Sequence, residues 1–170
     1  MSEHTEAGTD ARTQNFLWES YIKAGQSALT HKNPLEATRM FSVAMEKSKS
    51  FGGLDWRQLE TLRWLSMSYF DSKDYDRAET YLIELLDILF AKFGGDSPEL
   101  NEGLHLLAMI YEQQGKYRKA AAMIQHLANN HPKRFTCDSD PDYKALQSKY
   151  RQLLNKAHNE TTPKDVHWIN

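Results

Sequence analysis

The sequence predicts an all-α fold built from stacked helical hairpins, and three observations lead to this class. The chain repeats itself at a spacing of 41 to 42 residues, as Ala37, Ala78 and Ala120 show. Within each repeat the apolar residues follow helical spacing, whereas no segment sustains the alternation typical of a strand. A single helical hairpin cannot bury its apolar face alone, so neighbouring hairpins stack and share a core.

The repeat extends well beyond the three alanines. Residues separated by the same 41 and then 42 positions are alike in size. Small residues correspond at Gly25, Ser66 and Ala108, and large residues correspond at Tyr21, Leu62 and Leu104 and at Phe41, Leu82 and Ile124. Two Phe-Gly-Gly segments, beginning at Phe51 and Phe93, are also 42 residues apart. This agreement indicates three structural units of one kind.

The boundaries of the helices are marked by capping residues. Asn33, Asp55 and Ser97 each stand where a helix N-cap is expected, and Asn33 and Ser97 are followed by proline. Gly52 and Gly94 are suited to the left-handed conformation that ends a helix. Short turns at 72–74 and 114–116 then join two helices into a hairpin.

A final helix follows the three units. Asp140 and Pro141 start it by the same cap-and-proline pattern, and Tyr143, Leu146, Tyr150, Leu153 and Leu154 form its apolar stripe. We expect this helix, residues 140–157, to cover the third hairpin as a solubilising cap. The predicted organisation is a flexible N-terminus (1–10), one domain (11–158, with repeats at about 16–51, 55–93 and 97–132) and a flexible tail (159–170).

The third unit carries the most specific motif. Leu104-x-x-Leu107-Ala108-x-x-Tyr111 is followed by Gly115-Lys116-Tyr117-x-x-Ala120, and Pro132 closes the unit. This pattern resembles a tetratricopeptide repeat, and the long second helices make it similar to the 42-residue variety of kinesin light chains. The resemblance implies a right-handed superhelical stack of three hairpins plus the capping helix, an α-solenoid. It also implies protein binding in a concave groove lined by the first helix of each pair.

The resemblance places a set of groove positions on this chain. In the first unit they include Glu19, Ile22 and Lys23, and we expect all groove positions to be partly exposed. The candidate binding residues lie in the second and third units: Arg63, Trp64, Met67, Phe70, His105, Met109 and Glu112. Exposed apolar side chains here would supply buried area to a partner, and Arg63, His105 and Glu112 would set its orientation. Met67 and Met109 replace the asparagines that carboxylate-clamping repeats use, which disfavours recognition of a C-terminal carboxylate.

Composition excludes several other functions. Lys and Arg number 21 against 23 Asp and Glu, a balance that argues against a nucleic-acid-binding domain. Cys137 is the single cysteine, and His126 and His131 do not share a helix face, so we expect no metal site. No nucleophile, general base or phosphate loop can be assembled. We therefore predict no enzyme activity and no cofactor.

The predicted function is protein–protein interaction by a cytoplasmic adaptor or assembly factor that binds a peptide or helix. No segment is apolar enough to enter a membrane. One alternative is a small client-holding chaperone, because the chain is similar in length and repeat number to chaperones of type III secretion translocators. The other is a self-assembling scaffold, a homo-oligomer in which the tail near Trp168 enters a neighbour's groove.

Overall fold

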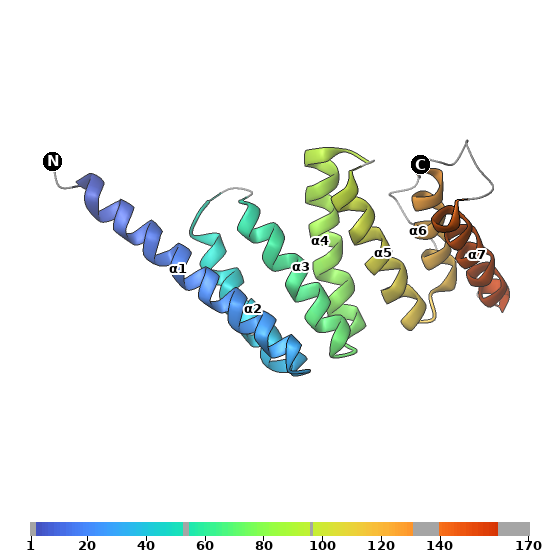
Figure 1. Cartoon of the computed structure of the whole chain (residues 1–170), viewed down its shortest axis with the longest axis horizontal. Helices are drawn as coiled ribbons and strands as arrows, with labels where there is room; N and C mark the ends of the chain where they lie inside the picture. Colours follow the sequence, from blue (N-terminus) through green and yellow to red (C-terminus); the bar gives the residue numbers. More distant parts are fainter. Residues whose placement is uncertain (1–2, 53–54, 96, 131–139, 160–170) are drawn as a thin grey trace. The chain divides into compact units, whose positions relative to one another are not determined.

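The computed structural model describes residues 3–52, 55–95, 97–130 and 140–159, and these residues form helices joined by short turns, with no strand among them (Figure 1). The elements are α1 (Glu3–Thr30), α2 (Pro34–Lys49), α3 (Trp56–Asp71), α4 (Tyr75–Phe93), α5 (Pro98–Gln113), α6 (Tyr117–Asn129), α7 (Pro141–Lys156) and a 3₁₀ turn, η1 (Ala157–Asn159). The all-α class predicted from the sequence is confirmed. Helix α1 begins at Glu3, inside the stretch for which the sequence analysis expected flexibility.

The chain divides into two compact units, residues 1–85 and residues 86–170, and the division falls within α4. Unit 1 contains α1, α2, α3 and the first half of α4. Unit 2 contains the remainder of α4 together with α5, α6 and α7.

The predicted N-caps are in place. Asn33 accepts a hydrogen bond from the backbone N–H of Glu36, and Ser97 accepts one from Leu100. Asp55 bonds the N–H of Arg57, while Asp140 bonds the N–H groups of two first-turn residues. Each cap satisfies donors that the first turn of a helix leaves unpaired, which is why the helices begin at these residues.

The predicted helix-ending glycines also adopt the expected conformation. Gly52 has φ +72° and Gly94 has φ +81°, both in the left-handed region that is costly for residues with a Cβ. Gly94 directly follows Phe93, the last residue of α4, whereas α2 ends at Lys49 and Gly52 turns the chain two residues after the C-cap Ser50.

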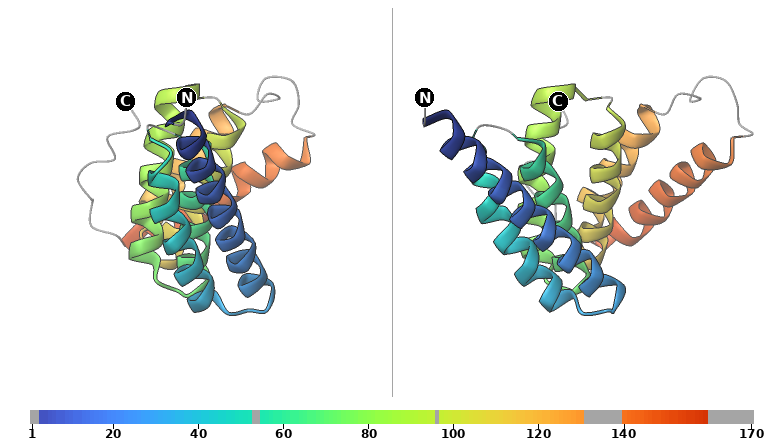
Figure 2. Two further views of the ribbon diagram at one scale, coloured as in Figure 1. Left: turned by 90° about the vertical axis from the view of Figure 1, so that its left-hand side faces the viewer. Right: turned by 60° about the vertical axis from the view of Figure 1, so that its left-hand side comes forward.

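In unit 1, helices α1 and α2 approach closely and α3 packs against α2 (Figure 2). Gly25 on α1 faces the ring of Phe41 on α2, and a Cβ at position 25 would lie only 2.4 Å from Phe41 Cε1. On its other side Phe41 stacks on Trp64 of α3, with ring centroids 5.6 Å apart. The absence of a side chain at position 25 therefore sets the distance between the first two helices.

Two buried polar contacts tie the helices of unit 1 together. Trp18 Nε1 on α1 donates to Thr61 Oγ1 on α3 at 2.9 Å. The hydroxyls of Thr38 on α2 and Ser68 on α3 share a hydrogen bond of 3.0 Å. Because unpaired buried polar groups are costly, these pairs favour one relative placement of the helices.

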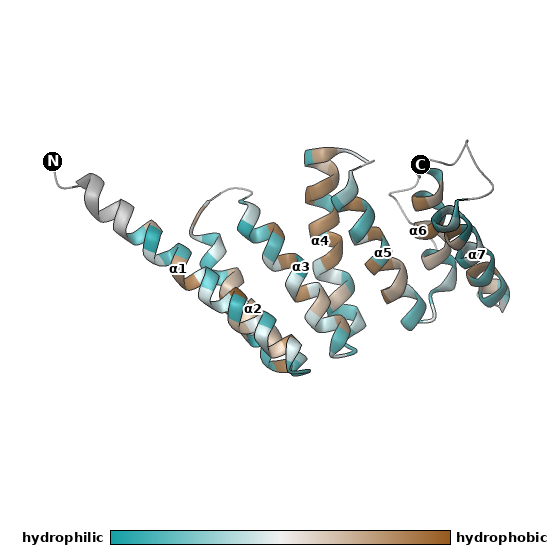
Figure 3. Cartoon of the chain, viewed as in Figure 1, coloured by the Kyte–Doolittle hydropathy of each residue, from teal (hydrophilic) through white to brown (hydrophobic). Residues whose placement is uncertain are grey.

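Unit 2 is built around α5 and α6, with α7 packed against α6. Ile110 on α5 and Leu153 on α7 are fully buried, and Ile124 on α6 is nearly so. Helix α7 is hydrophilic over most of its length (Figure 3). Leu154, which the sequence analysis placed on the packing stripe of this helix, is 44% exposed instead, because the helix contacts its neighbours mainly through the face of Leu153.

Within the described part of the chain, no helix has both the length and the apolar character needed to cross a bilayer.

Candidate functional site

A pocket of about 500 Å³ lies in unit 2 between α5, α6 and α7. Its lining combines small and apolar side chains with four polar ones: Ala108, Met109, Ile124, Ala145 and Leu146, together with His105, Glu112, Asp142 and Lys149. A mainly apolar lining with a few polar groups is typical of a binding site.

Helix α5 supplies one wall of this pocket. His105, Met109 and Glu112 are separated by four and three residues, so they follow one face of the helix. Met109 is 50% exposed although it is a large apolar residue. The three third-unit residues predicted from the sequence are therefore brought together at one surface.

Glu112 connects this wall to α7. Its two carboxylate oxygens accept hydrogen bonds from Lys149 Nζ at 2.5 Å and from Lys156 Nζ at 2.7 Å. These bonds hold the pKa of Glu112 below its ordinary value, although partial burial acts in the opposite direction. The carboxylate that the sequence analysis assigned to a ligand is thus engaged by the protein's own lysines.

His105 contributes a polar group without a charge. Its side chain is still exposed in part, but burial by its neighbours lowers the pKa of the imidazole from its ordinary value of 6.5. The ring is therefore mainly neutral at pH 7, and it can both donate and accept a hydrogen bond.

The second-unit candidates lie on α3, in unit 1. Trp64 is half-buried because it stacks on Phe41, and the guanidinium of Arg63 lies 5.9 Å from the Trp64 ring centroid. Phe70 is half-buried and packs edge-to-face on Tyr75 at 5.7 Å. Met67 is half-buried, whereas Arg63 is exposed. Both aromatic side chains therefore have a packing role in the fold.

One expectation about the groove positions is wrong. Ile22 was expected to be partly exposed, but it is only 5% exposed and belongs to the core of unit 1. The cause is that α1 is contacted by both α2 and α3, so its buried face is wider than a single hairpin requires.

The residues weighed for metal chemistry have other surroundings. His126 lies within 3.4 Å of the Gly95 carbonyl oxygen and 2.9 Å from Asn130 Nδ2. His131 and Cys137 lie outside the described residues, as does the tail around Trp168. No group of three His, Cys, Asp or Glu side chains that could hold a metal ion occurs in the described ranges.

A second hollow lies in unit 1 beside α1, and Glu19 is the one residue of its lining that the sequence analysis placed in the groove. Phe16 and Trp56 are 68% and 52% exposed in this region, and Arg57 lies between aromatic rings. The available signal was the adjacent pair Trp56-Arg57 directly after the Asp55 cap, since tryptophan and arginine are frequent energetic anchors at interfaces.

Helical hairpins repeated every 41 to 42 residues define the class of helical-repeat proteins. A family profile described as tetratricopeptide repeat matches residues 57–131. These residues are tetratricopeptide repeats, and the chain has the fold of the kinesin light chain-like members.

Two solved structures show this likeness of fold. A kinesin light chain candidate from Podosopora anserina, with nearly identical TPR-like repeats, superposes with a TM-score of 0.66 at 15% identity, over 81% of this chain and 65% of that one. BtubC (BKLC) from P. vanneervenii superposes with a TM-score of 0.71 at 17% identity, over 85% of this chain and 57% of that one. The chain thus spans less than two thirds of the length of either protein. A comparison with curated proteins finds no match.

Proposed function

We propose that the chain is an adaptor or assembly factor that binds a peptide or helix of another protein at the pocket between α5, α6 and α7. The observation that supports this proposal is that Met109, a large apolar side chain that is 50% exposed, lines a mainly apolar pocket. Tetratricopeptide repeats are generally non-catalytic interaction scaffolds, which supports a binding role.

In this proposal Met109 provides most of the contact area on α5. An apolar side chain of the partner would enter between Met109, Leu146 and Ile124. Methionine suits this role because its flexible, polarisable side chain adapts to different shapes. Covering the exposed half of Met109 would contribute roughly 1 kcal/mol, since burying a whole side chain of this size is worth about 1.5–3 kcal/mol.

The polar residues have different roles. His105, being mainly neutral, would bond a backbone or side-chain group of the partner. Glu112 would act indirectly, because it holds α7 against α5 through Lys149 and Lys156 and so keeps the second wall of the pocket in position. Loss of this carboxylate should weaken binding without removing a direct contact.

The candidates on α3 remain predicted contacts. Arg63 is exposed, and Met67 is half-buried. Trp64 and Phe70 offer only the parts of their rings that Phe41 and Tyr75 leave uncovered. The cytoplasmic location also remains a prediction.

The test compares the wild type with Met109→Glu as affinity baits in lysate of the source cell. Leu154→Glu is the matched control, because it introduces the same charge at a similarly exposed apolar residue of unit 2 that does not line the pocket. Circular dichroism establishes that all three proteins are equally helical. A protein recovered with the wild type and with Leu154→Glu, but lost with Met109→Glu, would support the proposal.

Equal recovery with all three baits would refute binding at this pocket. A partner lost with Met67→Glu but retained with Met109→Glu would move the site to α3. A bait that recovers only further copies of itself would favour self-assembly. A client that is soluble only when co-expressed would favour the chaperone alternative.

A further inference from the structure

Met109 differs in its exposure from the other methionines that the structure describes. It is 50% exposed. Of the others in the described ranges, one is buried and three are half-buried: Met123, and Met40, Met45 and Met67. Because a dissolved oxidant reacts first with the side chains it can reach, Met109 is the described methionine that is most open to oxidation.

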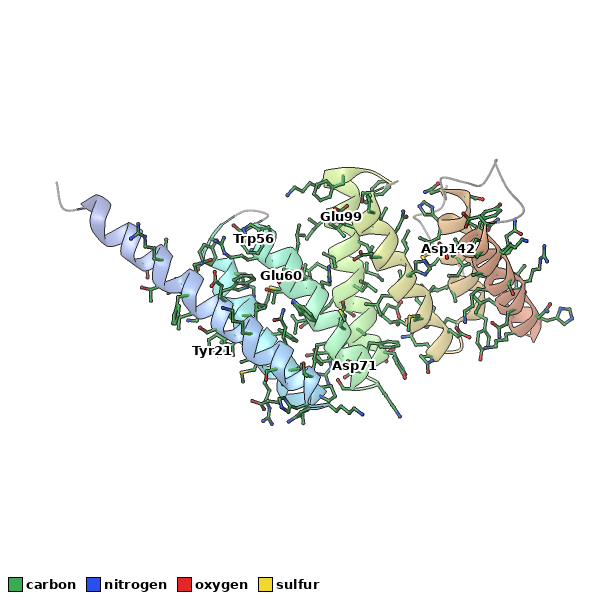
Figure 4. All side chains as sticks on the ribbon, in the orientation of Figure 1. Tyr21, Trp56, Glu60, Asp71, Glu99 and Asp142 are labelled. Carbon is green, nitrogen blue, oxygen red and sulfur yellow. The ribbon has the colours of Figure 1, made fainter. Side chains whose placement is uncertain are left out.

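The same side chain lines the pocket of unit 2. It faces this cavity of about 500 Å³ together with Ile124 of α6 and Leu146 of α7. Asp142, which lines the pocket from the first turn of α7, marks the position of that wall in Figure 4. A chemical change at Met109 therefore alters the lining of the pocket directly.

The thioether of methionine reacts with peroxides in a balanced two-electron step. A lone pair on the Met109 sulfur attacks one oxygen of hydrogen peroxide, the O–O bond breaks, an S–O bond forms, and the proton moves to the departing oxygen, which leaves as water. The sulfur is oxidised to a sulfoxide and the peroxide is reduced. Thiol-dependent sulfoxide reductases reverse this change, because two thiols supply the electrons, become a disulfide and release the oxygen as water.

A sulfoxide makes the pocket less suited to an apolar ligand. Its oxygen is a hydrogen-bond acceptor, which has to give up water when an apolar side chain covers it. Two side chains of the lining can donate a hydrogen bond: His105, which carries one N–H when neutral, and Lys149, which is bound to Glu112. The oxidised pocket would therefore present a hydrated oxygen where the reduced pocket presents a thioether.

The core of unit 2 is protected from the same reaction. The neighbours of Met109 along α5 that pack inside, Leu107, Ala108 and Ile110, are each 4% exposed or less. Met123 on α6 is 2% exposed, so its oxidation would require the helices to open. The lining of the pocket can thus change while the helices stay packed.

We propose that Met109 is a redox-sensitive modification site: hydrogen peroxide converts it to the sulfoxide, which lowers the affinity of the pocket of unit 2 for an apolar segment of a partner, and reduction restores this affinity. The inference rests on the proposed binding function of the pocket and adds its regulation. The reduced chain is the form that binds.

The first measurement identifies the methionine that is oxidised. The full chain with Cys137→Ser, which removes a competing thiol, is treated with hydrogen peroxide, quenched with free methionine at intervals, digested and analysed by mass spectrometry. Met109 should be oxidised roughly tenfold faster than Met123, and faster than the three half-buried methionines. A rate at Met109 that does not exceed the rates at the half-buried methionines would overturn the proposal.

The second measurement connects the sulfoxide with binding. A random dodecapeptide library displayed on phage is panned against the reduced Cys137→Ser chain. The probes that are kept lose affinity with Met109→Glu but still bind Met109→Leu. Each protein is then compared with itself before and after peroxide treatment. Probe affinity for the Cys137→Ser chain should fall about tenfold, because an unbonded polar oxygen is costly to cover. It should return after treatment with both methionine sulfoxide reductases, one for each sulfoxide epimer, and dithiothreitol.

Two variants in the Cys137→Ser background control this result. Leucine is similar in size to methionine and cannot form a sulfoxide, so peroxide should not change the affinity of Met109→Leu for the probes. Met45→Leu is the matched control, because it removes a half-buried methionine of α2 that does not line the pocket. This protein should still lose affinity on oxidation. Circular dichroism should show the same helicity before and after treatment.

The binding outcomes separate the regulation from the function. Probes whose affinity is unchanged by oxidation would refute the redox site and leave the binding function in place. A loss of affinity that persists in Met109→Leu would assign the effect to another residue and would also refute the site. If panning yields no probe that distinguishes Met109→Glu from Met109→Leu, the binding function is refuted and the regulation with it.

Discussion

Replacing Gly25 by alanine tests the closest approach between α1 and α2. The added Cβ would lie 2.4, 2.6 and 2.7 Å from three carbons of the Phe41 ring. Ordinary contacts between carbon atoms are about 3.5–4.0 Å, so the ring or a helix must move by roughly 1 Å. Phe41 is fully buried and stacks on Trp64, which leaves it little room to move.

The change in the free energy of unfolding caused by Gly25→Ala is the sum of two opposing effects. Overpacking a well-filled core costs about 1–3 kcal/mol. Alanine in a helix interior is favoured over glycine by about 1 kcal/mol, which offsets part of this cost. Because the contact is far inside van der Waals range, we expect the upper part of the overpacking range and a net loss of about 1–2 kcal/mol in the free energy of unfolding.

Urea denaturation followed by circular dichroism measures this loss. The double variant Gly25→Ala/Phe41→Leu is the control, because the smaller side chain at position 41 should remove the clash and make the Gly25→Ala change nearly neutral or favourable in that background. A Gly25→Ala protein that is about 1 kcal/mol more stable than wild type would show helix propensity alone. That result would refute the close packing of α1 on α2.

Two further predictions concern polar contacts. Glu112→Gln should reduce the free energy of unfolding by about 1 kcal/mol at pH 7, since it weakens the charge-assisted bonds from the partly exposed Lys149 and Lys156. The pKa of Glu112 is lowered in the fold, so the difference in stability between Glu112→Gln and the wild type should be complete above the ordinary value of 4.5. It should shrink as the pH falls through the lower pKa of the folded state. Denaturation at several pH values tests this prediction, and a stability difference that is independent of pH would contradict the ion pairs. Trp18→Phe should lower the free energy of unfolding by about 1–3 kcal/mol, because Thr61 loses the indole donor of a buried hydrogen bond. Thermal or urea unfolding measures this loss, and an unchanged stability would mean that the bond does not fix α1 on α3.

The helix boundaries could be predicted from local sequence. Asn33, Asp55, Ser97 and Asp140 cap helices as expected, and Gly52 and Gly94 have the left-handed conformation that the predicted helix ends require. Capping depends on a residue and its next three neighbours, so a single sequence contains all the information it needs.

The candidate binding residues could be predicted only in part. The resemblance to tetratricopeptide repeats selected His105, Met109 and Glu112, and helical spacing places them on one face of α5. It could not show that Glu112 is bound by lysines 37 and 44 positions away on α7. It also could not show that Trp64 is partly covered by Phe41, or that Phe16 and Trp56 remain exposed.

The sequence by itself determined that this protein is an all-α chain of repeated hairpins, because helical periodicity, caps and repeats are properties of neighbouring positions along the chain. The tertiary structure alone decided which side of each helix is available to a partner. Ile22 and Leu154 illustrate this, since one is buried against expectation and the other is exposed. Exposure depends on which helices lie against a face and at what distance, and these are set by contacts between residues far apart in the sequence.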